Sequence, residues 1–134
     1  MKRKWLWTFL LILVIVLTLF TCTKTRIRAN QDVTLVFIYG EKNINVVLPE
    51  DEAAKVIEIL NGNSYDLSFL ASYPSCGFNQ NVALKVGNRN FAIACDTCNC
   101  VQDGLTLMRF DIPKEDMAYI HSLFEKYGGY FPCI

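Results

Sequence analysis

Polar and apolar positions repeat with two different periods along most of the chain. Runs rich in β-branched and aromatic residues predict strands, and these runs lie at 32–39, 44–48, 82–86, 91–95 and 105–112. Apolar residues recur at helical spacing in two other segments, 49–60 and 113–127, each opened by a proline and acidic residues. This order predicts an α+β fold: a mostly antiparallel sheet of about five strands with two helices on one face, after an N-terminal hydrophobic helix.

An uncharged apolar run at 5–21 precedes these elements, and threonines are its only polar residues. As a helix that rises about 1.5 Å per residue, its seventeen residues reach roughly 26 Å, the short end of what spans a bilayer. We therefore interpret residues 1–22 as a membrane anchor or a signal sequence. Three interpretations stay open: a retained signal-anchor helix, a lipoprotein signal with lipidation at Cys22, and a conventionally cleaved signal.

The formal net charge of zero conceals an uneven distribution of charge. Six of the thirteen basic residues lie within the first 28 positions, where no acidic residue occurs. The remainder holds seven basic and thirteen acidic residues, a net charge of −6. We interpret residues 23–31 as a basic stalk and residues 32–134, called the body, as a small acidic domain. An acidic body argues against a nucleic-acid partner, because such binding requires a cationic surface.

The apolar run also sets the expected location of the protein. Three basic residues flank the run on each side, and the terminal amine adds a slight positive excess at its start, which favours an N-terminus inside the cell. We expect a single-pass protein of a bacterial cell membrane, in contact with the membrane through residues 5–21 and with an extracytoplasmic body. The alternatives are a lipid-anchored body and a secreted one.

Six cysteines are the most concentrated source of chemistry in the sequence, and three of them lie within six residues: Cys95, Cys98 and Cys100. In an oxidising compartment, disulfides are the usual state of cysteines in a small domain. Four cysteines allow three pairings, among which sequence does not choose. We expect structural disulfides within the set Cys76, Cys95, Cys98 and Cys133.

A thiolate metal site is the first alternative for these cysteines. Cys95, Cys98 and Cys100 could direct three sulfur ligands toward one Zn²⁺ or Cu(I) ion, and Cys76 or Cys133 could complete the site. The sequence signature of a zinc site is incomplete, however, because there is no second Cys-x-x-Cys pair and only one histidine.

Thiol–disulfide exchange by Cys95 and Cys98 is the second alternative, and it is the only candidate enzymatic chemistry. A low thiol pKa typically requires a helix N-terminus, whereas this pair is followed by a predicted loop and neighbours Asp96, which would raise the thiol pKa. No other catalytic motif is present. We therefore expect a non-catalytic binding or interaction domain, with no cofactor and an unknown protein partner, and keep a thiolate metal-binding protein as the alternative function.

Overall fold

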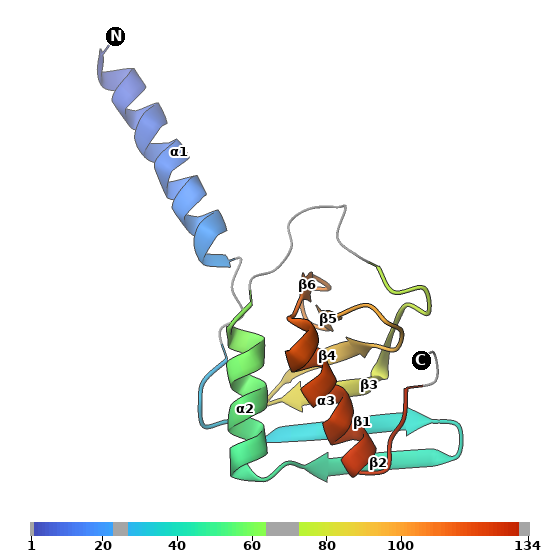
Figure 1. The fold of residues 1–134 in the computed structure, drawn as a ribbon. Coiled ribbons are helices and arrows are strands. Elements are labelled where there is room, and N and C mark those ends of the chain that lie inside the picture. Colours follow the sequence, from blue (N-terminus) through green and yellow to red (C-terminus); the bar gives the residue numbers. More distant parts are fainter. Residues whose placement is uncertain (1, 23–26, 64–72, 132–134) are drawn as a thin grey trace.

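The computed structural model of the chain describes residues 2–22, 27–63 and 73–131, and side chains of the first helix from residue 4 to residue 18 (Figure 1). Its elements follow the chain in this order: α1 (Lys2–Cys22), β1 (Val33–Tyr39), β2 (Lys42–Val47), α2 (Glu50–Asn61), β3 (Phe78–Val86), β4 (Arg89–Ala94), β5 (Cys100–Asp103), β6 (Arg109–Asp111) and α3 (Lys114–Lys126). The predicted α+β class is confirmed.

The strands form one antiparallel sheet in the order β2-β1-β3-β4-β5-β6. Helices α2 and α3 both lie on one face of this sheet (Figure 1). The sheet has six strands where about five were predicted, because a hairpin replaces the strand expected at 105–112. Its first strand, β5, begins inside the cysteine-rich stretch that the sequence predicted to be a loop.

The core lies between the sheet and the two helices. Alternate residues of β1 point toward the helices, so Val33, Leu35 and Phe37 are fully buried. Phe124 of α3 packs edge-on against Phe37, with 6.4 Å between the ring centroids. Gly129 permits this packing, because a Cβ atom there would lie 3.3 Å from the Phe37 ring and 3.1 Å from the Phe124 carbonyl oxygen.

Turn chemistry explains the β3–β4 hairpin. Two residues, Gly87 and Asn88, connect the strands, and Gly87 has a φ of +56°. A two-residue turn that follows the strand twist requires positive φ at one or both positions, which glycine adopts without steric cost. The hairpin predicted from the Gly-Asn pair is thus present.

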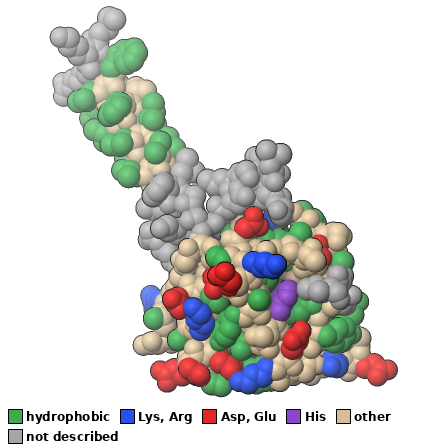
Figure 2. Space-filling view, viewed as in Figure 1, with side chains coloured by type: hydrophobic (Ala, Val, Ile, Leu, Met, Phe, Trp, Pro, Cys, Tyr) green, Lys and Arg blue, Asp and Glu red, His purple; other side chains and the backbone are tan. Residues whose placement is uncertain are grey.

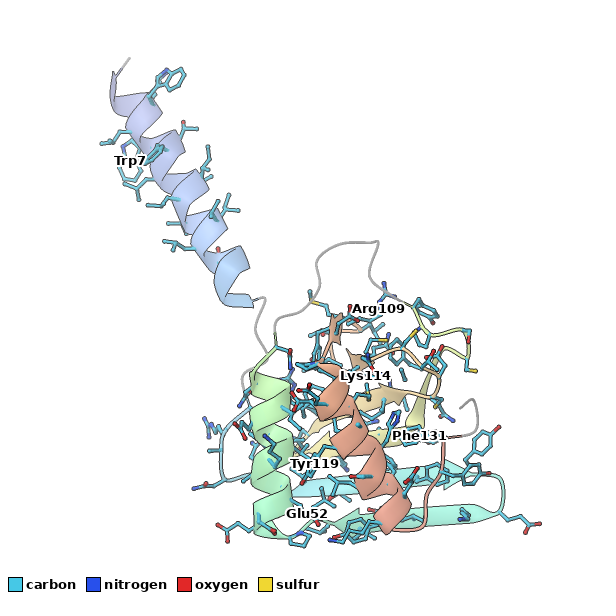
Figure 3. All side chains as sticks on the ribbon, in the orientation of Figure 1. Trp7, Glu52, Arg109, Lys114, Tyr119 and Phe131 are labelled. Atoms are coloured by element: carbon cyan, nitrogen blue, oxygen red, sulfur yellow. The ribbon has the colours of Figure 1, made fainter. Side chains whose placement is uncertain are left out.

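A polar cluster joins the two helices at their exposed edge. Glu52 of α2 forms an ion pair with Lys126 of α3 and accepts a hydrogen bond from the Tyr127 hydroxyl at 2.8 Å. Glu52 lies in the first turn of α2, at the lower end of that helix in Figure 3. The cluster therefore fixes the relative position of the two helices that cover the sheet.

Helix α1 projects away from the body, and its described side chains are exposed (Figures 1 and 2). Across the described parts of the chain, we find no helix with both the length and the apolar character needed to cross a membrane. This finding corrects the predictions of a transmembrane signal anchor and of a single-pass location in the cell membrane.

Candidate functional site

The described residues contain two candidate sites. The first is the connection between β4 and β5, residues 95–100, called the cysteine loop. The second is a cavity beside α2.

Asp96 organises the cysteine loop. Its side chain is 8% exposed and accepts hydrogen bonds from the Ser75 backbone N–H at 2.6 Å, the Ser75 hydroxyl at 3.1 Å and the Cys98 backbone N–H at 2.9 Å. Burial alone would raise the pKa of Asp96, but the hydrogen bonds from Cys98 and Ser75 outweigh it and lower the pKa below its ordinary value. Asp96 is thus a structural anion that ties residue 75 to the loop.

The Asp96→Asn variant should show this role in the pH dependence of stability. A carboxyl group whose pKa is lower in the folded than in the unfolded chain stabilises the fold above the unfolded pKa of about 3.9. That contribution is lost as the pH falls through the lower folded pKa. We expect the wild type to exceed Asp96→Asn in urea midpoint at pH 7, and the difference to shrink below about pH 4. The exposed Asp111→Asn variant is the control, and an equal pH dependence of the two variants would contradict the assignment.

The three thiols of the cysteine loop have raised pKa values and therefore low reactivity. Cys95, Cys98 and Cys100 are free, and Cys95 and Cys100 are buried. Burial, followed by the charges of Cys98, Asp111 and Asp96, raises the pKa of Cys100 to about 12. Burial also raises the pKa of Cys95 and of Cys98, with a further increase from the neighbouring Asp96 carboxylate. All three sulfurs are therefore protonated near neutral pH, and a protonated thiol is a poor nucleophile.

Cys76 is disulfide-bonded, and Cys95, Cys98 and Cys100 are not its partners, because all three are free. Cys133 lies outside the described residues. The disulfide set predicted from the sequence, Cys76, Cys95, Cys98 and Cys133, thus stays a prediction. In this structure, Cys95 and Cys98 are free thiols. Residue 22, the lipidation candidate, ends α1, and its side chain is not described.

The cysteine loop does not gather its sulfurs around one point. Cys95 belongs to the core beneath the helices, as does Val101, whereas Cys100 adjoins Val101 on β5. Successive side chains of a strand point to opposite faces, so Cys100 faces away from that core. Among the described residues, no three His, Cys, Asp or Glu side chains are placed to hold a metal ion. The predicted Zn²⁺ or Cu(I) site of Cys95, Cys98, Cys100 and Cys76 therefore stays a prediction. The described residues do not form a metal site in this structure.

Alkylation of the native protein checks the state of the thiols. With iodoacetamide at pH 7.5, we expect Cys98 to react more slowly than free cysteine, because its pKa is raised. Cys95 and Cys100 should react only after unfolding in urea, because both are buried. Mass spectrometry of peptides sampled over time gives the three rates. Rapid labelling of Cys100 in the folded protein would contradict this arrangement.

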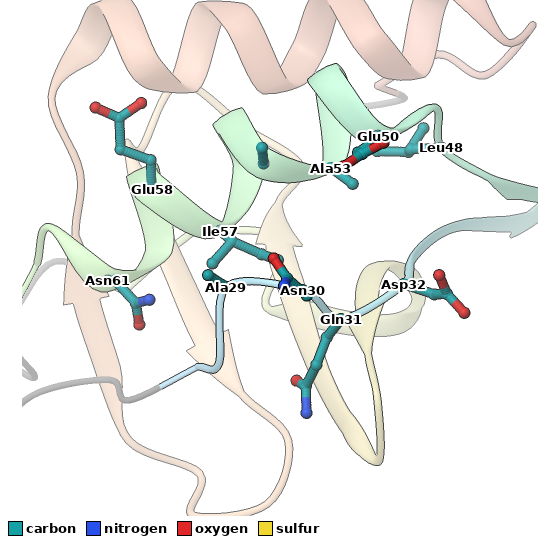
Figure 4. Close-up of a pocket in the computed structure, with 11 residues that line it drawn as sticks. Ala29, Asn30, Gln31, Asp32, Leu48, Glu50, Ala53, Ile57, Glu58 and Asn61 are labelled. Atoms are coloured by element: carbon teal, nitrogen blue, oxygen red, sulfur yellow. The ribbon is translucent and has the colours of Figure 1, made fainter.

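The second region is a cavity of about 530 Å³ between α2 and the segment 27–32, called the strap (Figure 4). Asn61, the last residue of α2, holds the strap in place: its Oδ1 accepts the Ile27 N–H at 2.8 Å, and its Nδ2 donates to the Ile27 carbonyl oxygen at 2.8 Å. The Ile27 side chain is buried, with 8% exposed. The strap therefore packs on α2 along part of the region that the sequence predicted to be a stalk, whose residues 23–26 lie outside the described residues.

Apolar and polar groups line different parts of this cavity. The buried residues Leu48, Ala53 and Ile57 face it from α2 and the preceding turn. The polar lining consists of three carboxylates and three amides, contributed by Asp32, Glu50, Glu58, Asn30, Gln31 and Asn61. The volume lies within the range of about 300 to 1,000 Å³ that is typical of small-molecule sites. The arrangement is suited to a ligand with both an apolar part and a polar group.

The carboxylates differ in their partners. Glu58 forms an ion pair with Lys55 at 3.2 Å and points away from the strap in Figure 4. Asp32 and Glu50 have neither a hydrogen-bond nor an ion-pair partner among the described side chains. Two carboxylates next to the cavity are therefore available to a ligand.

Comparison with known proteins adds no function to this geometry. No protein-family model matches the chain, and neither the curated proteins nor the solved structures contain a match. The site must be judged on its own residues.

Sequence reasoning singled out the cysteine loop and missed the cavity. The predicted helix ends at residue 60, just before Asn61, and most of the strap lies in the predicted stalk. The hydrogen bonds between Asn61 and Ile27 join residues 34 positions apart. A local sequence pattern does not predict such a contact. The one available signal was the uncharged segment 29–31 within the predicted basic stalk.

Replacing Asn61 with alanine should release the strap. Both Ile27 backbone groups lose their side-chain partner, so we expect the free energy of unfolding to fall by about 1 to 2 kcal/mol. Urea denaturation measures this loss, and hydrogen exchange at the Ile27 amide should accelerate at the same time. The Asn45→Ala variant, which removes an exposed amide from β2, is the control. Unchanged exchange at Ile27 would contradict the role of Asn61.

Proposed function

We propose that the body is a non-catalytic binding domain whose ligand occupies the cavity between the strap and α2. The proposal rests on two kinds of group that line one cavity of about 530 Å³. The carboxylates of Asp32 and Glu50 have no partner among the described side chains. The apolar lining comes from Leu48, Ala53 and Ile57. Binding sites typically combine a mainly apolar lining with a few polar groups that orient the ligand.

The state of the reactive groups supports a binding role over an enzymatic one. The thiols of the cysteine loop have raised pKa values, and Asp96 is committed to three hydrogen bonds. Burial lowers the pKa of His121, the single histidine, and its ring stacks on Phe131 at 3.9 Å between centroids. General acid–base catalysis needs a titrating group within reach of substrate, whereas these groups serve packing and loop structure.

Fragment binding to the ¹⁵N-labelled full-length chain tests the proposal. The screen uses small fragments with cationic, neutral and anionic head groups. We expect at least one of them to shift the amide signals of residues 29–32 and of α2 in a saturable manner. The Ala29→Phe variant should abolish those shifts, because Ala29 is exposed, lines the cavity and would place a ring in it. Ala118→Phe, which adds the same ring at an exposed position of α3, is the matched control.

Two outcomes of this titration would contradict the proposal. Absence of saturable shifts at the strap and α2 with every fragment would contradict a binding function of this cavity. Shifts that persist equally in Ala29→Phe would do the same, because they would place the ligand elsewhere.

A further inference from the structure

The charge around the cavity beside α2 indicates which chemical class of ligand it would bind. Three of the residues that line the cavity are acidic, Asp32, Glu50 and Glu58, and none is Lys or Arg. Glu58 is neutralised by Lys55, so the unpaired charge comes from Asp32 and Glu50. A ligand in this space therefore meets two negative charges and no positive side chain among the residues that line it.

The other described cations near the cavity are either paired or outside its lining. Arg28 of the strap is exposed and is not among the lining residues, and Lys55 is paired with Glu58. Lys126, the α3 cation in the described cluster next to α2, is paired with Glu52. Glu50 is the first residue of α2, so its carboxylate lies beside the positive end of the helix dipole. That end carries about half an elementary charge, which is less than the two full charges of Asp32 and Glu50. The residues that line this end of the cavity therefore carry a net negative charge.

The apolar lining restricts the ligand further. Leu48, Ala53 and Ile57 offer no ligating atoms, and hard metal ions such as Ca²⁺ take six to eight oxygen ligands. Among the described residues, no group of three ligating side chains is placed for a metal ion. A bare metal ion therefore fits poorly, whereas a hydrocarbon chain would cover these three side chains.

We propose that the cavity binds a small organic cation, an ammonium group on an apolar chain, with the nitrogen beside Glu50 and Asp32 and the chain against Leu48, Ala53 and Ile57. This inference rests on the proposed function of the same cavity and names its ligand class. Charge assistance gives the ammonium group an advantage over neutral and anionic groups of the same length.

Three probes of equal chain length test the ligand class: hexylamine, hexanol and hexanoate, each titrated into the ¹⁵N-labelled full-length chain at pH 7. We expect hexylammonium to shift the amide signals of the strap and α2 with an affinity about tenfold above that of hexanol, and hexanoate to bind more weakly than hexanol. The exposed apolar side chains of α1 would take a hexyl group regardless of its charge. Residue-resolved signals separate that contact from binding at the cavity.

Matched charge variants locate the ammonium group. The Asp32→Asn and Glu50→Gln changes, combined, should reduce hexylammonium affinity about tenfold and leave hexanol affinity unchanged. Asp51→Asn is the control, because Asp51 lies in the same first turn of α2, is exposed, and does not line the cavity. An equal effect of Asp51→Asn would overturn the assignment, since it would indicate only the general charge of the turn.

The two proposals fail in different ways. If hexanol or hexanoate bound at the cavity as tightly as hexylammonium, the cationic ligand class would be wrong while the cavity remained a binding site. If no probe and no other fragment shifted the strap and α2 in a saturable manner, both the ligand class and the binding function would be wrong.

Discussion

Replacing Asp103 with alanine is expected to lower the free energy of unfolding by about 3 kcal/mol, at the lower end of the range for a broken buried ion pair. The Asp103 side chain is fully buried at the end of β5, and its Oδ2 lies 2.6 Å from Nη2 of Arg89. The carboxylate also accepts hydrogen bonds from the Leu105 N–H at 3.0 Å and the Thr106 hydroxyl at 3.2 Å.

The size of the effect follows from what the substitution leaves behind. The Arg89 side chain is 24% exposed and packs over the Phe91 ring at 5.0 Å, so its charge would lose its carboxylate partner while mostly removed from water. The β5–β6 turn would also lose two of its hydrogen bonds. About 3 kcal/mol is a large share of the 5 to 15 kcal/mol that stabilises a typical domain.

Urea denaturation followed by circular dichroism measures the loss. Asp111→Ala, which removes an exposed carboxylate from neighbouring β6, should change stability by less than about 0.5 kcal/mol. An Arg89→Leu, Asp103→Leu double variant should be more stable than Asp103→Ala, because it removes both charges of the pair instead of one. A loss below about 1 kcal/mol in Asp103→Ala would contradict the role of the pair.

Replacing Phe124 with alanine is expected to cost about 3 to 5 kcal/mol, the range for removal of a large buried aromatic side chain. Phe124 has no exposed surface, and its ring packs against Phe37 at 6.4 Å and Phe131 at 5.3 Å between centroids. These contacts join α3 and the segment after it to β1 of the sheet. A cavity at this point would weaken the attachment of the whole helix.

The milder Phe124→Leu variant, which keeps most of the apolar volume, should cost clearly less than Phe124→Ala and keeps the test informative if the alanine variant does not fold. Leu105→Ala is the surface control, because Leu105 is 72% exposed and its loss should stay within about 0.5 kcal/mol. Equal unfolding midpoints for Phe124→Ala and Leu105→Ala in urea would contradict the position of Phe124 in the core.

The elements with strong local patterns were predictable from the sequence. The β-branched and aromatic run at 32–39 predicts a strand, and the proline that precedes each of α2 and α3 predicts where those helices begin. Strand β5 was missed, because a stretch of only four residues, Cys100–Asp103, carries too short a pattern and ends in a buried aspartate. That aspartate is accommodated by Arg89, fourteen positions earlier, and local sequence does not encode such a pairing.

The candidate site was less predictable than the fold, for a related reason. The cysteine loop attracted attention because its residues are rare and close in sequence, yet burial and the Asp96 carboxylate keep its thiols protonated. The cavity consists of common residue types from two segments that meet through Asn61 and Ile27. A binding site that forms through a long-range contact between common residue types can be identified only from the three-dimensional structure.

The most direct measurement of the central claim is a crystal structure of the full-length protein grown with hexylamine. The account predicts electron density for one hexylammonium ion between the strap and α2, with its nitrogen within hydrogen-bonding distance of Glu50 or Asp32. Its hydrocarbon chain should lie against Ile57. A cavity without ligand density at saturating hexylamine, or density only at the cysteine loop or along α1, would contradict the account.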